Sequence, residues 1–111
     1  MTKEIWKDIE GYEGHYQVST LGMVRSLDFE KHFYPMERKP YTKILKGQML
    51  NPYFNAQGFM VVKLYKGKEC KIKLVHRLVA IAFVKNPLEY KKVKFKDGDR
   101  SNVKMENLKW C

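Results

Sequence analysis

One stretch in the middle of the chain restricts the fold more than any other, because two strand-like segments flank a short polar turn. Phe59–Tyr65 and Cys70–Val75 are rich in β-branched, aromatic and aliphatic residues, and Lys66–Glu69 separates them with a glycine at its second position. Two such segments joined by a few residues that include glycine are typical of an antiparallel β-hairpin. We therefore predict a hairpin over residues 59–75, around which the core must be built.

The second arm of this hairpin alternates between lysine and aliphatic residues. Successive side chains of a strand point to opposite faces, so Lys71 and Lys73 share one face, opposite Ile72 and Leu74. A face that carries two lysines could contact a nucleic-acid backbone. It could equally protect an exposed strand edge from pairing with another chain.

Residues 76–84 follow the hairpin as an apolar run that ends shortly before Asn86-Pro87. Apolar residues recur at helical spacing, at Val75, Leu78, Ile81 and Ala82. A proline soon after such a run is a frequent helix stop. We predict a short, buried helix here.

A second hairpin is predicted near the N-terminus. Tyr16–Ser19 alternates as a strand, Gly22 supplies a turn, and Met23–Leu27 is the returning strand. After residue 47 the chain again favours strands, with Gln48–Leu50 before an Asn-Pro break and Asn55–Gly58 as a turn. The predicted fold class is α+β, a small domain rich in β-hairpins with one short helix.

Residues 28–47 are polar, basic and interrupted by Pro35 and Pro40, so we predict an irregular, mobile loop. Basic and aromatic residues are interleaved in it, namely Lys31, His32, Phe33, Tyr34, Arg38, Lys39, Tyr41, Lys43 and Lys46. This interleaving suits phosphate contacts combined with base stacking, and it is equally typical of a solvated loop. The chain then divides into an N-terminal module (residues 1–28), a basic aromatic loop with a short strand (29–58) and a C-terminal region (59–111).

The net charge limits the kinds of partner that this protein is expected to bind. The 111 residues include 22 lysines and arginines against 12 acidic residues, a formal charge of +10. A domain this basic attracts polyanions over a long range, so nucleic acid is the first partner to consider. An anionic membrane surface is less favoured, because no basic amphipathic helix is predicted.

Cysteine and histidine spacing argues against a metal or disulfide scaffold. Cys70 and Cys111 are far apart, and neither His15 nor His32 has a partner at metal-ligand spacing. The first residues do not form a signal peptide, and the longest apolar run, Leu78–Val84, is too short to span a bilayer. We expect no cofactor, no bound metal, no membrane contact and a reducing cytoplasm.

The C-terminal stretch carries a motif that points to a family. Residues 93–110 read V-K-F-K-D-G-D-R-S-N-V-K-M-E-N-L-K-W. This resembles the HNH homing endonucleases of phages and introns, in which the pattern is roughly v-n/d-H-x-D-G-n-x-x-N-n-x-x-x-N-L-x-W. Residues 6–27 resemble the module that precedes the HNH region in that family, with one departure at Thr20, and the sequence V-H-R-L-V-A-I-A-F at 75–83 resembles the segment just upstream of the HNH hairpin.

The resemblance implies a β-hairpin and a helix closing around one divalent metal, with a histidine as general base. Phe95 stands at the general-base position and Lys94 at the adjacent metal-ligand position, while Asn107 stands where the family orients the histidine. The sequence ends at Cys111, before the helix that carries the last metal ligand in the family. We expect an incomplete HNH-like ββα-metal hairpin that has no catalytic residues and does not cleave.

Three neighbouring features favour structural roles. Asp97–Asn102 has the composition of a turn stabilised by aspartate and asparagine side chains with Gly98. Leu108 and Trp110 are predicted core residues. His76 precedes an arginine as it does in the family, and we predict that it is a structural histidine.

Two functions stay open. The first is a phage-type HNH-like protein that binds nucleic acid through its basic surface without cleaving it, in the cytoplasm of a bacterial host cell. Its binding should be dominated by phosphate contacts and depend strongly on salt. The candidate phosphate contacts are Arg25, Lys43, Lys46, Lys71, Lys73, Arg77 and Lys96.

The second is a phage inhibitor of a host protein, such as a CRISPR effector, another defence nuclease or the transcription machinery. A basic protein can occupy an acidic patch on such a target. A less favoured third function is an active metal-dependent HNH endonuclease whose remaining helix comes from elsewhere, against which Lys94 and Phe95 argue.

Overall fold

A computed structural model describes residues 3–111 as a small domain of mostly antiparallel strands with one α-helix in that part of the chain. The first sheet has the order β1-β2-β3 and the middle sheet the order β6-β7-β8, and β4-β5 and β9-β10 form two separate hairpins. The elements are β1 (Trp6–Asp8), β2 (Tyr16–Ser19), β3 (Val24–Ser26), β4 (Phe29–Phe33), β5 (Tyr41–Leu45), β6 (Tyr53–Phe54), β7 (Met60–Lys66), β8 (Glu69–Leu74), α1 (Val75–Phe83), β9 (Val93–Phe95), the 3-10 turn η1 (Met105–Asn107) and β10 (Leu108–Trp110). No helix in residues 3–111 has the length and apolar character needed to cross a membrane.

One hydrophobic core joins the first sheet, the middle sheet, α1 and the terminal hairpin. Its buried members are Ile9, Tyr12, Val18, Val24, Val62, Leu64, Val75, Leu78, Val79, Ala80, Val103, Leu108 and Trp110. The Trp110 indole N–H donates to the Val84 carbonyl at 3.1 Å, which ties β10 to the end of α1. The predicted core positions Leu108 and Trp110 are therefore confirmed, and the C-terminal hairpin depends on packing against the rest of the domain.

The first hairpin is confirmed. β2 pairs with β3, and Gly22 takes a φ of +84° in the turn between them. The Ser19 hydroxyl accepts the N–H groups of Leu21 and Met23 at 3.2 and 3.1 Å, which closes the turn. Gln48–Leu50, predicted as a strand, lies along β3 through a single bridge from Met49 rather than as a full strand.

The central hairpin is also confirmed. Its register shows which face of the sheet carries the two lysines, which the alternation alone does not. Lys71 pairs with Leu64, and Lys73 pairs with Val62. Directly paired residues of antiparallel strands point to the same face, so the two lysines lie on the face whose Leu64 and Val62 side chains are buried. Lys71 is exposed and Lys73 is half-buried on that face, and Ile72 lies on the other face with 60% of its surface exposed.

The predicted helix is confirmed, but one of its predicted apolar contacts is wrong. α1 buries Val75, Leu78 and Val79, whereas Ile81 is 49% exposed. Two residues turn an α-helix by about 200°, so Ile81 faces away from Val79. The helix therefore keeps an apolar side chain on its outer face.

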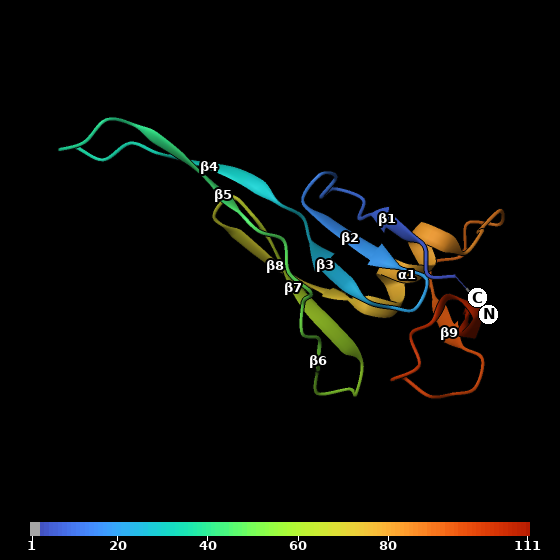
Figure 1. Cartoon of the computed structure of the whole chain (residues 1–111). Coiled ribbons are helices and arrows are strands. Elements are labelled where there is room, and N and C mark those ends of the chain that lie inside the picture. Colours follow the sequence, from blue (N-terminus) through green and yellow to red (C-terminus); the bar gives the residue numbers. More distant parts are fainter. Residues whose placement is uncertain (1–2) are drawn as a thin grey trace.

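The predicted loop over residues 28–47 is wrong. β4 and β5 pair in a regular antiparallel hairpin in which Lys31 pairs with Lys43 and Phe33 with Tyr41. This hairpin, which we call the arm, projects from the body of the domain (Figure 1). Both prolines lie in the connection between the two strands, outside the paired residues, where a missing N–H costs no ladder bond.

Candidate functional site

An aromatic cluster surrounds the position where the resemblance places a general base. The Phe95 ring lies 4.9 Å from the His76 ring and 6.2 Å from the Phe59 ring, centroid to centroid, and Phe59 stacks on His76 at 5.2 Å. β9 and α1 each contribute one of these rings, and Phe59 immediately precedes β7. The Phe95 side chain has no proton-accepting atom, so at this position it offers packing and no base chemistry.

His76 is the ionisable member of this cluster. It is 5% exposed, and its Nδ1 atom has no hydrogen-bond partner. Burial, with a smaller effect from the Arg77 guanidinium, lowers the pKa of His76 from 6.5 to about 4. The ring is neutral at neutral pH and packs between two aromatic side chains, in agreement with the predicted structural role.

The residue before Phe95 is a cation on an exposed face. Lys94 pairs directly with Lys109 across the β9-β10 hairpin, and both side chains are exposed. An ammonium group has no lone pair to give a metal, and the Phe95 ring has no ligand atom. Within residues 3–111 no group of three or more His, Cys, Asp or Glu side chains could hold a metal ion. The residues present therefore do not fit the divalent metal that the family implies.

The loop between β9 and β10 is a turn held by side-chain amides, as predicted. The buried Asn107 amide donates to Asp97 Oδ1 and to the Asn102 carbonyl, each at 2.9 Å, and its oxygen accepts the Asp97 N–H at 3.1 Å. Asn102 donates to Asp97 Oδ2 at 2.9 Å. Hydrogen bonds from Asn102, the Asp99 backbone and Asn107 lower the pKa of the Asp97 carboxyl. Asn107 thus secures the turn and has no histidine beside it to orient.

Arg100 lies over the Phe59 ring of the aromatic cluster, a contact that the sequence did not predict. Its guanidinium carbon lies 4.5 Å from the centre of the Phe59 ring, and it donates to the Gln57 carbonyl. The contact joins the β9-β10 loop to the turn before β7. No local signal predicts it, because the partners are more than forty residues apart in the chain.

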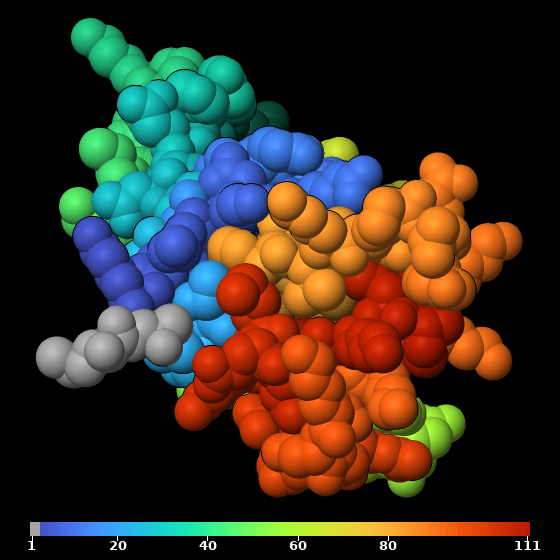
Figure 2. Space-filling model, turned by 90° about the vertical axis from the view of Figure 1, so that its right-hand side faces the viewer, coloured from blue at the N-terminus to red at the C-terminus, as the bar shows by residue number. Residues whose placement is uncertain are grey.

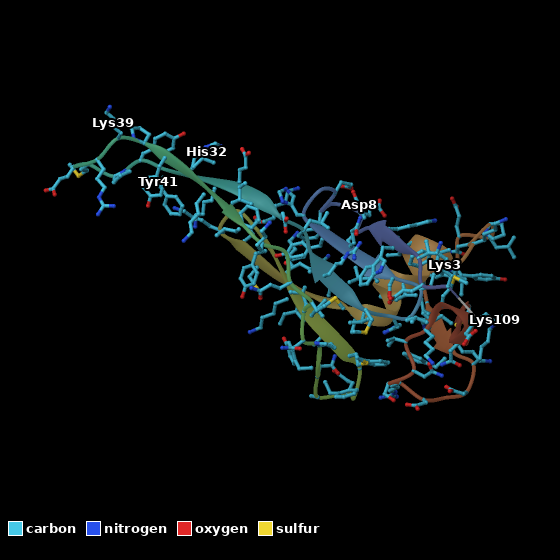
Figure 3. All side chains as sticks on the ribbon, viewed as in Figure 1. Lys3, Asp8, His32, Lys39, Tyr41 and Lys109 are labelled. Carbon is cyan, nitrogen blue, oxygen red and sulfur yellow. The ribbon has the colours of Figure 1, made fainter. Side chains whose placement is uncertain are left out.

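The arm gathers basic and aromatic side chains on one face. Phe33 and Tyr41 stack with their ring centres 5.0 Å apart, and the next pair on that face is Lys31 with Lys43. The Lys31 ammonium lies 5.4 Å from the Phe33 ring centre. Figure 3 places Tyr41 on this projecting hairpin and Lys39 farther out toward its end. The alternation in residues 29–33 and 41–45 is the signal from which this face could have been found.

The other predicted basic contacts are divided among three places. At the base of the arm, Arg25 stacks 4.0 Å over Trp6 and donates to Gln17, and Lys46 pairs with Asp28 at 3.6 Å. Lys71 and Lys73 lie on β8, and Arg77 lies on α1, where it donates to the Lys91 carbonyl. Lys96 lies on the β9-β10 loop and is exposed. The structure therefore brings Lys73 and Arg77 to one groove, but it does not gather the whole set on one surface.

Most of the basic side chains have no acidic partner. The single salt bridge in residues 3–111 is that of Lys46 with Asp28, although the chain has 22 lysines and arginines. Two lysine pairs, Lys31 with Lys43 and Lys94 with Lys109, stand directly opposite each other across exposed strands. Like charges at such positions destabilise a sheet, and a bound polyanion would remove that repulsion.

A small strand-rich domain with a single helix in the described residues has the fold of proteins related to HNH endonucleases. The NUMOD4 motif matches residues 4–65, more than half of the chain, and the chain belongs to this family. It is homologous to phage HNH homing endonucleases.

Three comparisons give the extent of this similarity. DNA endonuclease I-HmuI of Bacillus phage SP01 is 39% identical over 105 residues, which cover 95% of this chain and 51% of the relative. The uncharacterized HNH endonuclease L247 of Acanthamoeba polyphaga mimivirus is 29% identical over 115 residues, which cover 96% of this chain and 29% of the relative. The solved structure described as DNA binding and cleavage by the HNH homing endonuclease I-HmuI matches with a TM-score of 0.72 and 36% identity over 96% of this chain and 52% of that chain. The chain thus spans about half the length of I-HmuI and a smaller share of the mimivirus relative L247.

Proposed function

We propose that this protein binds nucleic acid through the arm and neighbouring lysines and does not cleave it. The observation that carries the proposal is the pair of exposed, directly opposed lysines on the arm, Lys31 and Lys43, beside the stacked Phe33 and Tyr41. Lysines contact phosphates, and aromatic rings stack on bases regardless of sequence. The DNA binding described for I-HmuI supports the same class of partner.

The absence of cleavage rests on the chemistry of two positions. Phe95 cannot take a proton from water, and the Lys94 ammonium would repel Mg²⁺ rather than bind it. His76 lies against Phe95, but its buried ring faces aromatic side chains, and its pKa of about 4 makes it a weak base. We infer that the C-terminal hairpin is an incomplete HNH-like hairpin retained for packing.

The binding experiment is a titration of a fluorescently labelled DNA duplex across a salt series. Each phosphate contact contributes about 0.9 to the slope of log affinity against log salt concentration. The double variant Lys31→Glu with Lys43→Glu should lower the affinity at every salt concentration and reduce that slope by about 2. If the duplex does not bind even at low salt, the proposal is wrong.

A matched control separates contact from net charge. Lys104 is exposed and lies in the loop before η1, on the C-terminal part of the domain. Lys85, which follows α1, is also exposed, and the variant Lys104→Glu combined with Lys85→Glu makes the same change in net charge as the arm variant. If both double variants weaken binding equally, the arm has no special role and the whole basic surface binds diffusely.

Cleavage is tested in the same samples with Mg²⁺ present and the product length monitored on a denaturing gel. We expect uncut DNA from the wild type. The variant Phe95→His with Lys94→Asp restores the two residue types of the family pattern. We expect it to stay inactive, because residues 3–111 contain no existing group of His, Cys, Asp or Glu side chains that could hold a metal ion. Cleavage by the wild type would contradict the proposal.

A second candidate function is the binding of a host protein, which inhibition of that protein would require, and one observation favours it. A groove beside α1 carries exposed aliphatic side chains and carboxylates, which suit a protein better than a nucleic acid.

A further inference from the structure

The groove runs between the turn after β1 and the outer face of α1. Its floor is apolar and consists of Ile9, Ile72, Leu74, Leu78, Ile81 and Ala82, and its volume is about 740 Å³. Ile72 and Ile81 are 60% and 49% exposed, which is a high exposure for two aliphatic side chains that line the same depression. In Figure 2 the N-terminal segment and the α1 segment lie next to each other on the face turned toward the viewer.

The two walls of the groove differ in charge, because all three of its carboxylates lie on one side. Asp8, Glu10 and Glu13 lie on the N-terminal wall, and Lys73 and Arg77 lie on the wall formed by β8 and α1. Asp8 already accepts hydrogen bonds from Gln17 and Gly14, and Glu13 accepts two from the Gly11 N–H. Lys7, also on the N-terminal side, donates to the Ala82 carbonyl at 3.1 Å. Glu10, Lys73 and part of the Arg77 guanidinium therefore remain as the groups that can pair with a ligand.

This charge pattern makes the groove less favourable for a polyanion than the basic remainder of the surface. Three of the chain's 12 acidic residues lie along one groove of a protein with a net charge of +10. The acidic wall would repel a phosphate backbone laid in the groove. Apolar side chains of a ligand would instead be stabilised there, because they would cover the apolar floor and remove it from water. The geometry points to a protein ligand, and we propose that the groove binds an amphipathic helix of a partner protein.

The ligand's chemistry follows from the groove. Leu74 at the end of β8 and Leu78, Ile81 and Ala82 of α1 follow helical spacing, so their ridge suits packing against a second helix. The partner helix presents apolar residues at i, i+3 or i+4, and i+7 toward this ridge. It carries lysine or arginine on the flank that faces Glu10 and an acidic residue on the flank that faces Lys73 and Arg77.

The probes are three labelled synthetic helical peptides of about 14 residues, roughly four turns, with the same apolar stripe. One has lysines on one flank and glutamates on the other, one has lysines on both flanks, and one has glutamates on both. Reversing the direction of a bound helix exchanges its two flanks. The mixed peptide can therefore match both walls in one of the two directions, whereas each of the other peptides matches only one wall in either direction. Fluorescence anisotropy at physiological salt should show that it binds roughly tenfold more tightly than the other two.

The groove is verified by variants that keep the fold. Ile81→Asp should weaken binding of the mixed peptide at least about tenfold, since the substitution puts a charge on the apolar floor. Ile44→Asp is the matched control, because Ile44 is 59% exposed on the arm and does not line the groove. Glu10→Lys should shift the preference toward the peptide with glutamates on both flanks.

Several outcomes would overturn the proposal. They are equal binding of all three peptides, no saturable binding of the mixed peptide, and displacement of that peptide by a DNA duplex. A dimer in sedimentation equilibrium that is lost in Ile81→Asp would assign the groove to a second copy of the chain. None of these results depends on whether the arm binds nucleic acid.

Discussion

At the scale of single residues, His76 couples stability to pH. Its pKa falls from 6.5 in the unfolded chain to about 4 in the folded protein, because burial disfavours the charged ring. The unfolded state therefore binds more protons between these values, so stability is full above pH 6.5 and is lost as the pH falls toward 4. The expected loss is about 2–3 kcal/mol at low pH.

Urea unfolding at a series of pH values measures this loss. His76→Phe replaces the ring by one of similar shape without an ionisable group or an unpartnered nitrogen. We expect the variant to lack the decline between pH 6.5 and 4, and a decline equal to that of the wild type would refute the assignment. The carboxyls of Asp28 and Asp97 have lowered pKa values, so their contributions are lost at lower pH, as each is protonated.

A glycine in the first turn provides a second test at this scale. A Cβ atom on Gly22 would clash with the Val103 side chain and lie 2.9 Å from its carbonyl oxygen, and the φ of +84° is itself unfavourable for alanine. Gly22→Ala should destabilise the domain by roughly 2–4 kcal/mol in urea unfolding. Gly67→Ala is the control, since its φ is +62° with open space around it, and should cost only about 1 kcal/mol.

At the scale of elements, the β9-β10 loop depends on one buried amide. Asn107→Ala removes three hydrogen bonds and leaves the Asp97 N–H and the Asn102 carbonyl without their partner. Unfolding should become easier by about 2–3 kcal/mol, since three partly buried hydrogen bonds are lost together. Asn102→Ala removes a single side-chain bond to Asp97 and should cost about 1 kcal/mol. Equal costs for the two variants would mean that Asn107 is not the residue that holds the loop.

Elements with strong local patterns were predictable from the sequence, and contacts between elements were not. The central hairpin and α1 follow from alternation and helical spacing within a few residues. The arm was missed because Pro35 and Pro40 suggested a loop, although both lie between the strands. The turn at Asp97 follows from its composition, whereas the packing of Phe59, His76 and Phe95 joins three elements and has no local signal. Ile81 was assigned to the wrong face because helical spacing alone does not show which face the core covers.

At the scale of the whole molecule, charge and shape separate the two proposed surfaces. The domain measures 57 × 33 × 26 Å along its principal axes, and the arm extends away from α1 along the long direction (Figure 1). Salt screens charges beyond about 8 Å at physiological ionic strength, so a charge introduced into the groove acts weakly on the arm. The groove also retains its own carboxylates, which keep a phosphate backbone out of it.

Duplex DNA and the mixed helical peptide should therefore bind at the same time and independently. We expect the peptide affinity to change less than about twofold when the duplex is saturating, which corresponds to a coupling free energy near zero. Lys31→Glu with Lys43→Glu should weaken only duplex binding, and Ile81→Asp should weaken only peptide binding, as measured by anisotropy with two different dyes. Mutual exclusion would mean that both ligands use one surface. In that case the unpaired lysines and the groove would belong to a single binding site. The domain would then bind one partner at a time instead of both together.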